Sequence, residues 1–167
     1  ASHLVVLQAE GIQALPPEYA AKARIIYQSA RPLVPGRRSR RHFDLALVGH
    51  LRPEKDPLTA VRALRRLPAE LPLRLFHIGN DLDPALAAEV HALAAADPRY
   101  RALGALSQAA TRQRIKRCHL LLLPSLMEGG ANVLIEAVTS GVPVLGSDIS
   151  GNRGMLGRDY PGWFPVG

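Results

Sequence analysis

Short apolar runs alternate with longer amphipathic segments from residue 43 onward. The apolar runs end at Gly or Pro, and several, such as the leucine run before Pro124, are apolar on both faces, which is typical of buried parallel strands. The longer segments repeat apolar residues every three or four positions, which predicts helices. We expect strands at residues 44–48, 73–78, 100–103, 119–123 and 142–145, and helices at residues 57–67, 83–96, 107–117, 131–140 and 152–156. This alternation predicts an α/β fold, a doubly wound parallel sheet with helices on both faces (Rossmann-like).

The first 42 residues follow a different pattern. Residues 1–31 contain the apolar run LVVLQ, a Pro-Pro turn, a short helix and a second apolar run at 25–27. Residues 32–42 are rich in Pro and Arg, which predicts an extended linker. We therefore expect one globular unit at 43–167, preceded by a linker and by a segment that belongs to another domain.

Composition and cysteine content narrow the class of protein. Hydrophobic residues make up 47% and charged residues 21% of the chain, which is typical of a globular domain. No apolar run approaches the about 18 residues of a membrane span, and the chain does not begin like a signal peptide, so we expect a cytoplasmic protein. The single cysteine, Cys118, excludes an internal disulfide, and its leucine-rich context favours an inert core thiol. The histidines are scattered, so no metal site is expected.

The net charge of +7 arises mostly from arginine, and its densest run is GRRSRRHF at residues 36–43. A solvated linker explains this run. Nucleic-acid binding through Arg37, Arg38, Arg40 and Arg41 is the alternative, but aromatic residues make up only 5% of the chain and none is interleaved with these arginines for base stacking. A basic chain also suits an anionic small molecule.

The segment PSLMEGGANVLIEA, residues 124–137, is the strongest candidate for a site. Ligands of doubly wound sheets bind outside the carboxyl ends of the strands, where this loop lies. Gly129 and Gly130 allow close approach of the backbone to a ligand, and the helix start favours an anion. Glu128 and Glu136 flank that anion position, which suits a nucleoside-diphosphate sugar. A surface helix with two ordinary glutamates explains the same residues equally well.

Two other loops follow predicted strands. In VGHLRPEKDP, Gly49 ends a strand, and His50, Arg52 and Lys55 could reach a phosphate, although solvated cations are the simpler interpretation. In ALGALS, the backbone groups of Ala105 and Leu106 could contact a nucleobase. The chain lacks the glycine fingerprint of dinucleotide-binding domains and the phosphate loop of nucleotide hydrolases.

Together these loops resemble the C-terminal half of GT-B retaining glycosyltransferases of family 4. The similarity covers about residues 43–157 and rests on VGHLRPEK, on PSLMEGGANVLIEA and on the GVPV that follows. It implies that Lys55 contacts the donor diphosphate, Glu128 the donor sugar and Glu136 the ribose, with Lys55 and Glu128 as the catalytic pair. It also implies that the amides of Gly130, Ala131 and Asn132 contact the phosphate or the sugar, with no metal and no cofactor beyond the UDP-sugar substrate.

The chain departs from the family pattern at three positions. His50 replaces the usual Arg, and Gly154 replaces a Glu. Ala131 replaces the second Gly of the loop at residues 128–132, which we call the glycine loop. A neutral imidazole is a weaker phosphate ligand than a guanidinium, so Arg52 is a candidate substitute.

The opening and closing segments, LVVLQAEGIQALP and GNRGMLGRDYPGWFPVG, are most similar to those of bacterial selenosugar synthases of the selenoneine pathway. Those enzymes join a UDP-N-acetylsugar, here UDP-N-acetylglucosamine, to selenophosphate. Under this resemblance, residues 1–31 are the tail of an N-terminal acceptor domain, 32–42 a linker, and 43–167 a donor-binding domain truncated at its C-terminus. We expect this chain alone to be inactive and to dimerise through its exposed N-terminal segment. The alternatives are a GT-B epimerase and a non-catalytic nucleotide-sugar or RNA-binding module.

Overall fold

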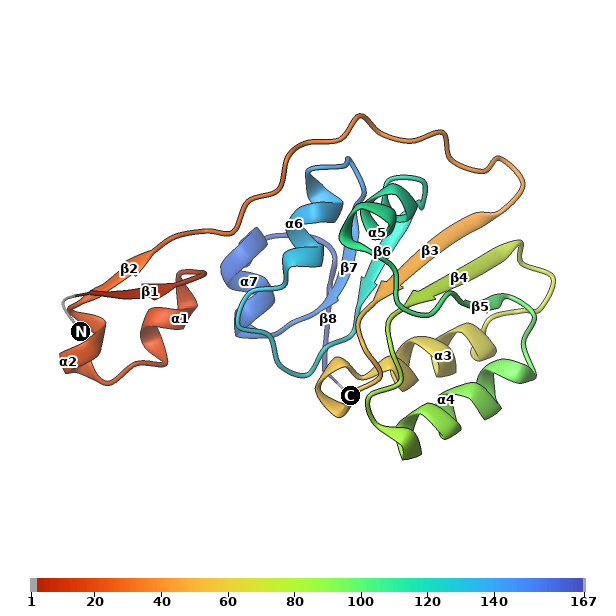
Figure 1. Ribbon diagram of the computed structural model, residues 1–167, viewed down its shortest axis with the longest axis horizontal. Coiled ribbons are helices and arrows are strands. Elements are labelled where there is room, and N and C mark those ends of the chain that lie inside the picture. The colour runs from red at the N-terminus through yellow and green to blue at the C-terminus, as the bar shows by residue number, and fades with distance from the viewer. Residues whose placement is uncertain (1–2, 167) are drawn as a thin grey trace.

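The computed structural model describes residues 3–166. Six parallel strands form one sheet in the spatial order β5-β4-β3-β6-β7-β8 (Figure 1). They are β3 (Phe43–Val48), β4 (Leu73–Ile78), β5 (Tyr100–Ala102), β6 (Leu120–Leu123), β7 (Val144–Ser147) and β8 (Trp163–Phe164). The chain builds outward from β3 to one edge, returns to β6 on the other side of β3, and then builds to the opposite edge. This order confirms the predicted α/β fold with a doubly wound parallel sheet.

Helices cover the sheet from both sides. On one face lie α3 (Pro57–Arg66) and α4 (Pro84–Ala95), and on the other lie α5 (Gln108–Ile115), α6 (Asn132–Val138) and α7 (Ser150–Leu156) (Figure 1). Successive residues of β3 point to opposite faces, so Leu45 and Leu47 pack with the first group of helices and Ala46 with the second. Within residues 3–166, no helix is both long enough and apolar enough to cross a membrane.

Three helices begin with a side-chain cap close to the carboxyl ends of the strands. Asp56, Asp83 and Ser107 each accept a hydrogen bond from the backbone N–H three residues further along the chain. Such caps satisfy an amide that the helix itself leaves without a partner. They fix where α3, α4 and α5 begin and therefore fix the loops that precede them.

Two strands of the six-stranded sheet differ by more than one residue from the sequence-based expectation. The strand expected at residues 142–145 runs from Val144 to Ser147, because Gly141 has a left-handed backbone (φ of 69°) and the Val142 N–H bonds back to Ala137. The edge strand β8 was not predicted, because two residues are too short for any periodic pattern.

The N-terminal segment forms its own two-stranded parallel sheet, outside the six-stranded one (Figure 1). It consists of β1 (Leu4–Val6), α1 (Glu10–Gln13), α2 (Pro17–Ala20) and β2 (Ala23–Ile25). Residues 26–42 contain no helix or strand and reach β3 after contacting the end of α5, where the Gly36 N–H bonds to the Lys116 carbonyl at 3.0 Å. The division into an acceptor-domain tail, a linker and a donor domain stays a prediction.

This segment packs against α7. The Gln8 side chain is buried beside Gly154, and a Cβ at position 154 would lie only 1.8 Å from Gln8 Oε1. Glu10 forms an ion pair with Arg158 at 2.9 Å and approaches Arg153 at 3.6 Å. Gly154, where the family pattern has Glu, therefore makes room for the N-terminal segment.

We expect Arg99→Ala to lower the free energy of unfolding by about 3 kcal/mol, measured by urea denaturation. The Arg99 side chain is 10% exposed, bonds to Asp97 at 2.7 Å and donates to the Leu64 carbonyl near the end of α3 at 2.7 Å. These hydrogen bonds hold the pKa of Asp97 below its usual range. The control is Arg62→Ala, whose ion pair with Glu89 is half exposed and should contribute less than about 1 kcal/mol. Equal losses in the two variants would contradict this account.

Candidate functional site

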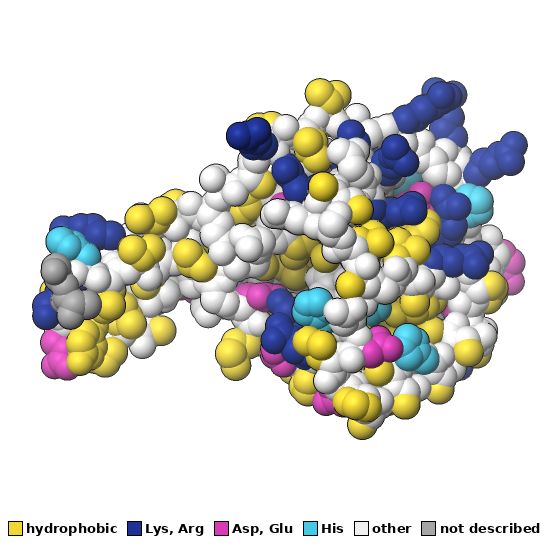
Figure 2. Space-filling model, in the orientation of Figure 1, with side chains coloured by type: hydrophobic (Ala, Val, Ile, Leu, Met, Phe, Trp, Pro, Cys, Tyr) yellow, Lys and Arg dark blue, Asp and Glu magenta, His cyan; other side chains and the backbone are white. Residues whose placement is uncertain are grey.

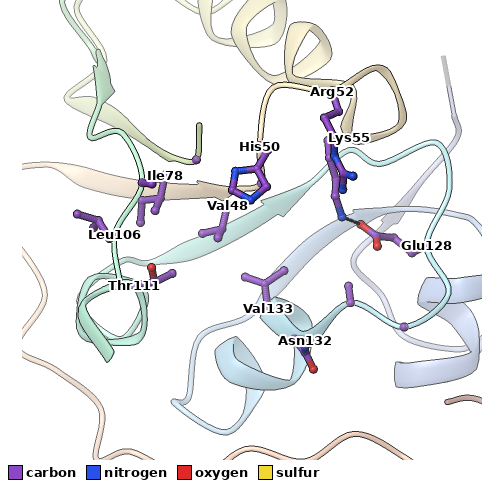
Figure 3. Close-up of a pocket in the computed structure, with 15 residues that line it drawn as sticks. Val48, His50, Arg52, Lys55, Ile78, Leu106, Thr111, Glu128, Asn132 and Val133 are labelled. Atoms are coloured by element: carbon purple, nitrogen blue, oxygen red, sulfur yellow. Dashed lines mark hydrogen bonds and ion pairs between the residues drawn. The ribbon is translucent and has the colours of Figure 1, made fainter. Parts of the chain in front are cut away.

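A cavity of about 360 Å³ lies at the carboxyl ends of the strands, where the sheet order reverses between β3 and β6 (Figure 3). Its walls come from the ends of β3 and β4, the loops after β3, β4, β5 and β6, α5 and the beginning of α6. The lining residues are Val48, Gly49, His50, Arg52, Lys55, Ile78, Gly79, Ala105, Leu106, Thr111, Glu128, Gly130, Ala131, Asn132 and Val133. Doubly wound sheets bind their ligands at this position.

Lys55 and Glu128 form an ion pair on one wall of the cavity (Figure 3). Lys55 Nζ lies 2.6 Å from Glu128 Oε1, and Ser125 Oγ donates to the same oxygen at 2.7 Å. Their side chains are 21% and 8% exposed. The second carboxylate oxygen, Oε2, accepts no hydrogen bond from any residue between 3 and 166. It is therefore available to a hydroxyl of a ligand.

Backbone contacts fix the loop that carries Glu128. The Leu126 N–H donates to the Glu54 carbonyl at 2.9 Å, which ties the loop after β6 to the loop after β3. Gly151 packs against the Glu128 backbone so closely that a Cβ at 151 would lie 1.8 Å from the Glu128 carbonyl oxygen. Only glycine allows this approach.

Buried polar side chains hold the loop that follows β6, where Glu128 lies. Asn152 is fully buried and donates from Nδ2 to the Ser147 carbonyl at 2.9 Å, and Ser147 Oγ donates to the Ser125 carbonyl. The sequence analysis did not assign Ser125 to the site, and it gave Ser147 and Asn152 no supporting role, because their contacts join two separate loops.

The glycine loop presents unpaired amides. Within the described part of the chain, none of the N–H groups of residues 129–133 donates a hydrogen bond to protein. Ala131 precedes α6 and provides no side-chain cap. The Asn132 side chain points away from Lys55 and His50, so this residue borders the cavity mainly through its backbone (Figure 3). Free amides next to a lysine favour an anion.

His50 and Arg52 also line the cavity, but each already has a partner. His50 Nδ1 accepts the Asn80 N–H at 3.0 Å, so this nitrogen is already used within the protein. Arg52 Nε lies 3.2 Å from the Glu54 carboxylate, and both side chains are partly exposed. Lys55 also has a partner, Glu128, and with 21% of its side chain exposed against 42% for Arg52 it is the more buried of these two cations.

A buried chain of hydrogen bonds reaches the cavity from the sheet interior. His77 is 3% and Tyr100 8% exposed. Tyr100 OH lies 2.7 Å from His77 Nδ1, and His77 Nε2 lies 2.9 Å from the Gly49 carbonyl oxygen. Burial lowers the pKa of His77 and raises that of Tyr100, so both side chains stay neutral at pH 7. The sequence analysis gave neither side chain a role.

Most of the predicted site residues come together in this cavity. The exceptions are Gly129 and Glu136, neither of which lines it, and Glu136 is 6% exposed. Glu136 Oε1 accepts a hydrogen bond from Gln108 Nε2 at 2.8 Å. Lining residues that the sequence analysis missed are Val48, Ile78, Gly79, Thr111 and Val133. The sequence marks these residues only by their place near the end of a predicted strand or in the first turns of a predicted helix. That position does not distinguish residues of the cavity wall from residues of the core.

Two other candidate chemistries have no site among residues 3–166. Cys118 is buried away from the cavity, and burial raises its pKa to about 12, as is typical of an inert core thiol. Between residues 3 and 166, no group of three or more His, Cys, Asp or Glu side chains is arranged to hold a metal ion.

Residues 37–165 match the family model described as glycosyl transferases group 1. This chain belongs to that family. The match spans the six-stranded sheet, the cavity and most of the linker. It confirms the prediction of a glycosyltransferase domain, and the two motifs that suggested it, around Lys55 and around Glu128, meet in the cavity of this family member.

Several solved structures are similar to this family member over its whole length. Anabaena Alr3699/HepE, in complex with UDP and glucose, is 19% identical with a TM-score of 0.82, and the match covers 100% of this chain and 50% of that one. The lipopolysaccharide outer core galactosyltransferase WaaB is 24% identical with a TM-score of 0.76, over 100% and 49% of the chains. The pneumococcal O-GlcNAc transferase GtfA, in complex with UDP and GlcNAc, is 21% identical with a TM-score of 0.78, over 100% and 34%. The likeness shows the GT-B fold, and this chain spans half or less of those proteins.

We expect the stability of this glycosyltransferase domain to fall more steeply below pH 6.5 than that of its His77→Gln variant. Because burial lowers the pKa of His77 in the folded state, the unfolded chain takes up the proton first, at its ordinary pKa of 6.5. The contribution of neutral His77 is therefore present above pH 6.5 and is lost as the pH falls through the folded pKa. Urea midpoints between pH 8 and 5 measure the effect, and parallel curves for the two proteins would contradict it.

Proposed function

We propose that this domain binds the nucleotide-sugar donor of a retaining glycosyltransferase. The observation that carries the proposal is the Lys55–Glu128 pair facing the unpaired amides of the glycine loop across one cavity. A cation and free amides suit a diphosphate, and a carboxylate oxygen without a partner suits a sugar hydroxyl. Membership of the family, and the UDP and UDP-sugar complexes of proteins with this fold, support the same ligand class.

The proposal assigns a role to seven of the residues that line the cavity. Lys55 binds the diphosphate and stabilises the negative charge that develops on it as the bond to the sugar breaks. The amides of Gly130, Ala131 and Asn132 bind the same group or the sugar. Glu128 accepts a hydrogen bond from the sugar through Oε2, which leaves Oε1 on Lys55. The backbone of Ala105 and Leu106 faces the base.

Glu136 is proposed to bind the ribose. Its Oε1 is held by Gln108, and its Oε2 accepts no hydrogen bond from the described residues. A ribose hydroxyl that donates to Oε2 would complete the pairing of a mostly buried carboxylate. Gln108 then acts as the group that orients Glu136.

The finer assignment is to UDP-N-acetylglucosamine as donor and selenophosphate as acceptor. It rests on the similarity of the opening and closing segments to selenosugar synthases. The acceptor would bind in an N-terminal domain, of which residues 1–31 are the tail, so this chain would bind the donor without transferring the sugar.

We expect this chain to bind UDP and UDP-N-acetylglucosamine but not GDP, and Glu136→Ala to lose that binding at least tenfold. Removing the carboxylate deletes a charge-assisted hydrogen bond to the ribose, which is worth about 1.5 to 3 kcal/mol. Isothermal titration calorimetry measures the affinities. The control is Glu89→Ala, which removes an exposed carboxylate from α4. Unchanged UDP affinity in folded Glu136→Ala protein would remove Glu136 from the site.

Lys55→Met should weaken UDP binding about tenfold and leave uridine binding unchanged, because the lysine contacts only the diphosphate. The same titrations with UDP and with uridine measure the difference. Met keeps most of the apolar stem of Lys55, which packs over Gly49. Equal weakening of both ligands would show that the change disturbs the whole cavity instead of one contact.

A further inference from the structure

The hydrogen-bond chain from Tyr100 through His77 to Gly49 has a defined direction. A carbonyl oxygen only accepts hydrogen bonds, so His77 Nε2 carries the proton that is donated to Gly49. In the neutral ring, Nδ1 is then an acceptor, and the Tyr100 hydroxyl donates to it. Tyr100 therefore fixes the tautomer of His77, and His77 fixes the Gly49 carbonyl.

Holding this carbonyl also sets the direction of the next amide. In a trans peptide, the N–H points opposite to the C=O. Since the Gly49 carbonyl points toward buried His77, the His50 N–H points away from His77, and both Gly49 and His50 line the cavity. The N–H groups on either side are used, by the Ile78 and Asn80 carbonyls, whereas that of His50 has no partner between residues 3 and 166.

The peptide after Gly49 needs to be held in place, because Gly49 has a flexible backbone. A residue without a Cβ has several backbone conformations of similar energy, so its peptide could turn over if it were not held. The loop after β4 adds a second restraint, because Gly79 approaches so closely that a Cβ there would lie 2.0 Å from the Gly49 oxygen. The stem of Lys55 covers the other side, with Cγ and Cδ at 3.4 and 3.5 Å from the position of a Gly49 Cβ. The His50 N–H and the Lys55 chain therefore border the same part of the cavity.

The free-energy cost of burying the His77 and Tyr100 side chains points to a functional role for this pair. Burying a hydroxyl and an imidazole in a sheet is unfavourable unless both are hydrogen-bonded, and an apolar pair at positions 77 and 100 would fill the same space without that cost. The polar pair lies next to the cavity, and its last hydrogen bond ends on a cavity residue, Gly49.

We propose that His77 and Tyr100 are positioning residues that hold the Gly49–His50 peptide with its N–H directed into the cavity, where it binds the diphosphate of the donor. This inference rests on the proposed function of the cavity. It gives position 50 a backbone role in place of the side-chain contact that Arg provides in the family pattern.

The test compares His77→Leu, His77→Gln and Tyr100→Phe with the unmodified chain. Leu removes the donor to Gly49, whereas Gln offers an N–H at a similar reach. We expect His77→Leu to weaken UDP and pyrophosphate binding about tenfold by calorimetry and to leave uridine binding unchanged. His77→Gln should restore most of the affinity, and Tyr100→Phe should lose a few-fold. In ¹⁵N-resolved NMR spectra, the His50 amide should shift on addition of pyrophosphate to the unmodified chain and to His77→Gln.

Several outcomes separate this inference from its alternatives. A folded His77→Leu protein that binds UDP normally would overturn it, as would equal losses of UDP and uridine or a failure of Gln to restore binding. If His77→Leu does not fold, the Tyr100→Phe variant and the His50 amide of the unmodified chain still test the inference. A His50 amide resonance that does not shift when pyrophosphate binds would overturn it. If the unmodified chain binds neither UDP nor pyrophosphate, the proposed function fails, and this inference fails with it.

Discussion

The pairing of β3 with β6 is the contact on which the rest of this structure depends. The two strands are adjacent in the sheet, with Leu45 opposite Leu120 and Leu47 opposite Leu122, although they are separated by two other strands along the chain. The loops that follow them diverge to opposite faces, which leaves a crevice between them. Lys55 comes from one loop and Glu128 from the other, so their 2.6 Å contact exists only because these two strands are neighbours.

Close approach of backbone segments holds the crevice in shape. Gly79 lies against the Gly49 carbonyl and Gly151 against the Glu128 carbonyl, each at a distance that no other residue would allow. These two glycines lie outside the glycine loop that marks the family, and their role is to bring neighbouring loops together. Polar side chains then fix the directions of the backbone groups, as His77 does for Gly49 and Ser147 does for Ser125.

Charge is distributed unevenly over the molecule. Lys and Arg side chains gather on the side where β3 and β4 begin (Figure 2), next to the arginine-rich residues 37–41 of the linker. The cavity at the other ends of the strands contains Lys55 and Arg52, each paired with a glutamate, and unpaired amides instead of a dense positive patch. Anion binding there would depend on geometry more than on net charge.

The N-terminal segment approaches the glycine loop of the cavity, since a Cβ at Gly130 would lie 3.0 Å from Leu7 Cβ.

The sequence by itself determined the strands, the helices and most of the cavity wall, because burial periodicity, caps and glycine loops are encoded within a few neighbouring residues. Alternation placed Leu45 and Ala46 on opposite faces of β3, and the spacing of the glycine loop identified Glu128. Only the tertiary structure decided that Glu136 is held by Gln108 and that His77 joins Tyr100 to Gly49. These contacts link residues 23 to 28 positions apart, on elements whose adjacency follows from strand order and packing. No local sequence pattern carries that information, because the same histidine would be an ordinary core residue if its strand lay between other strands.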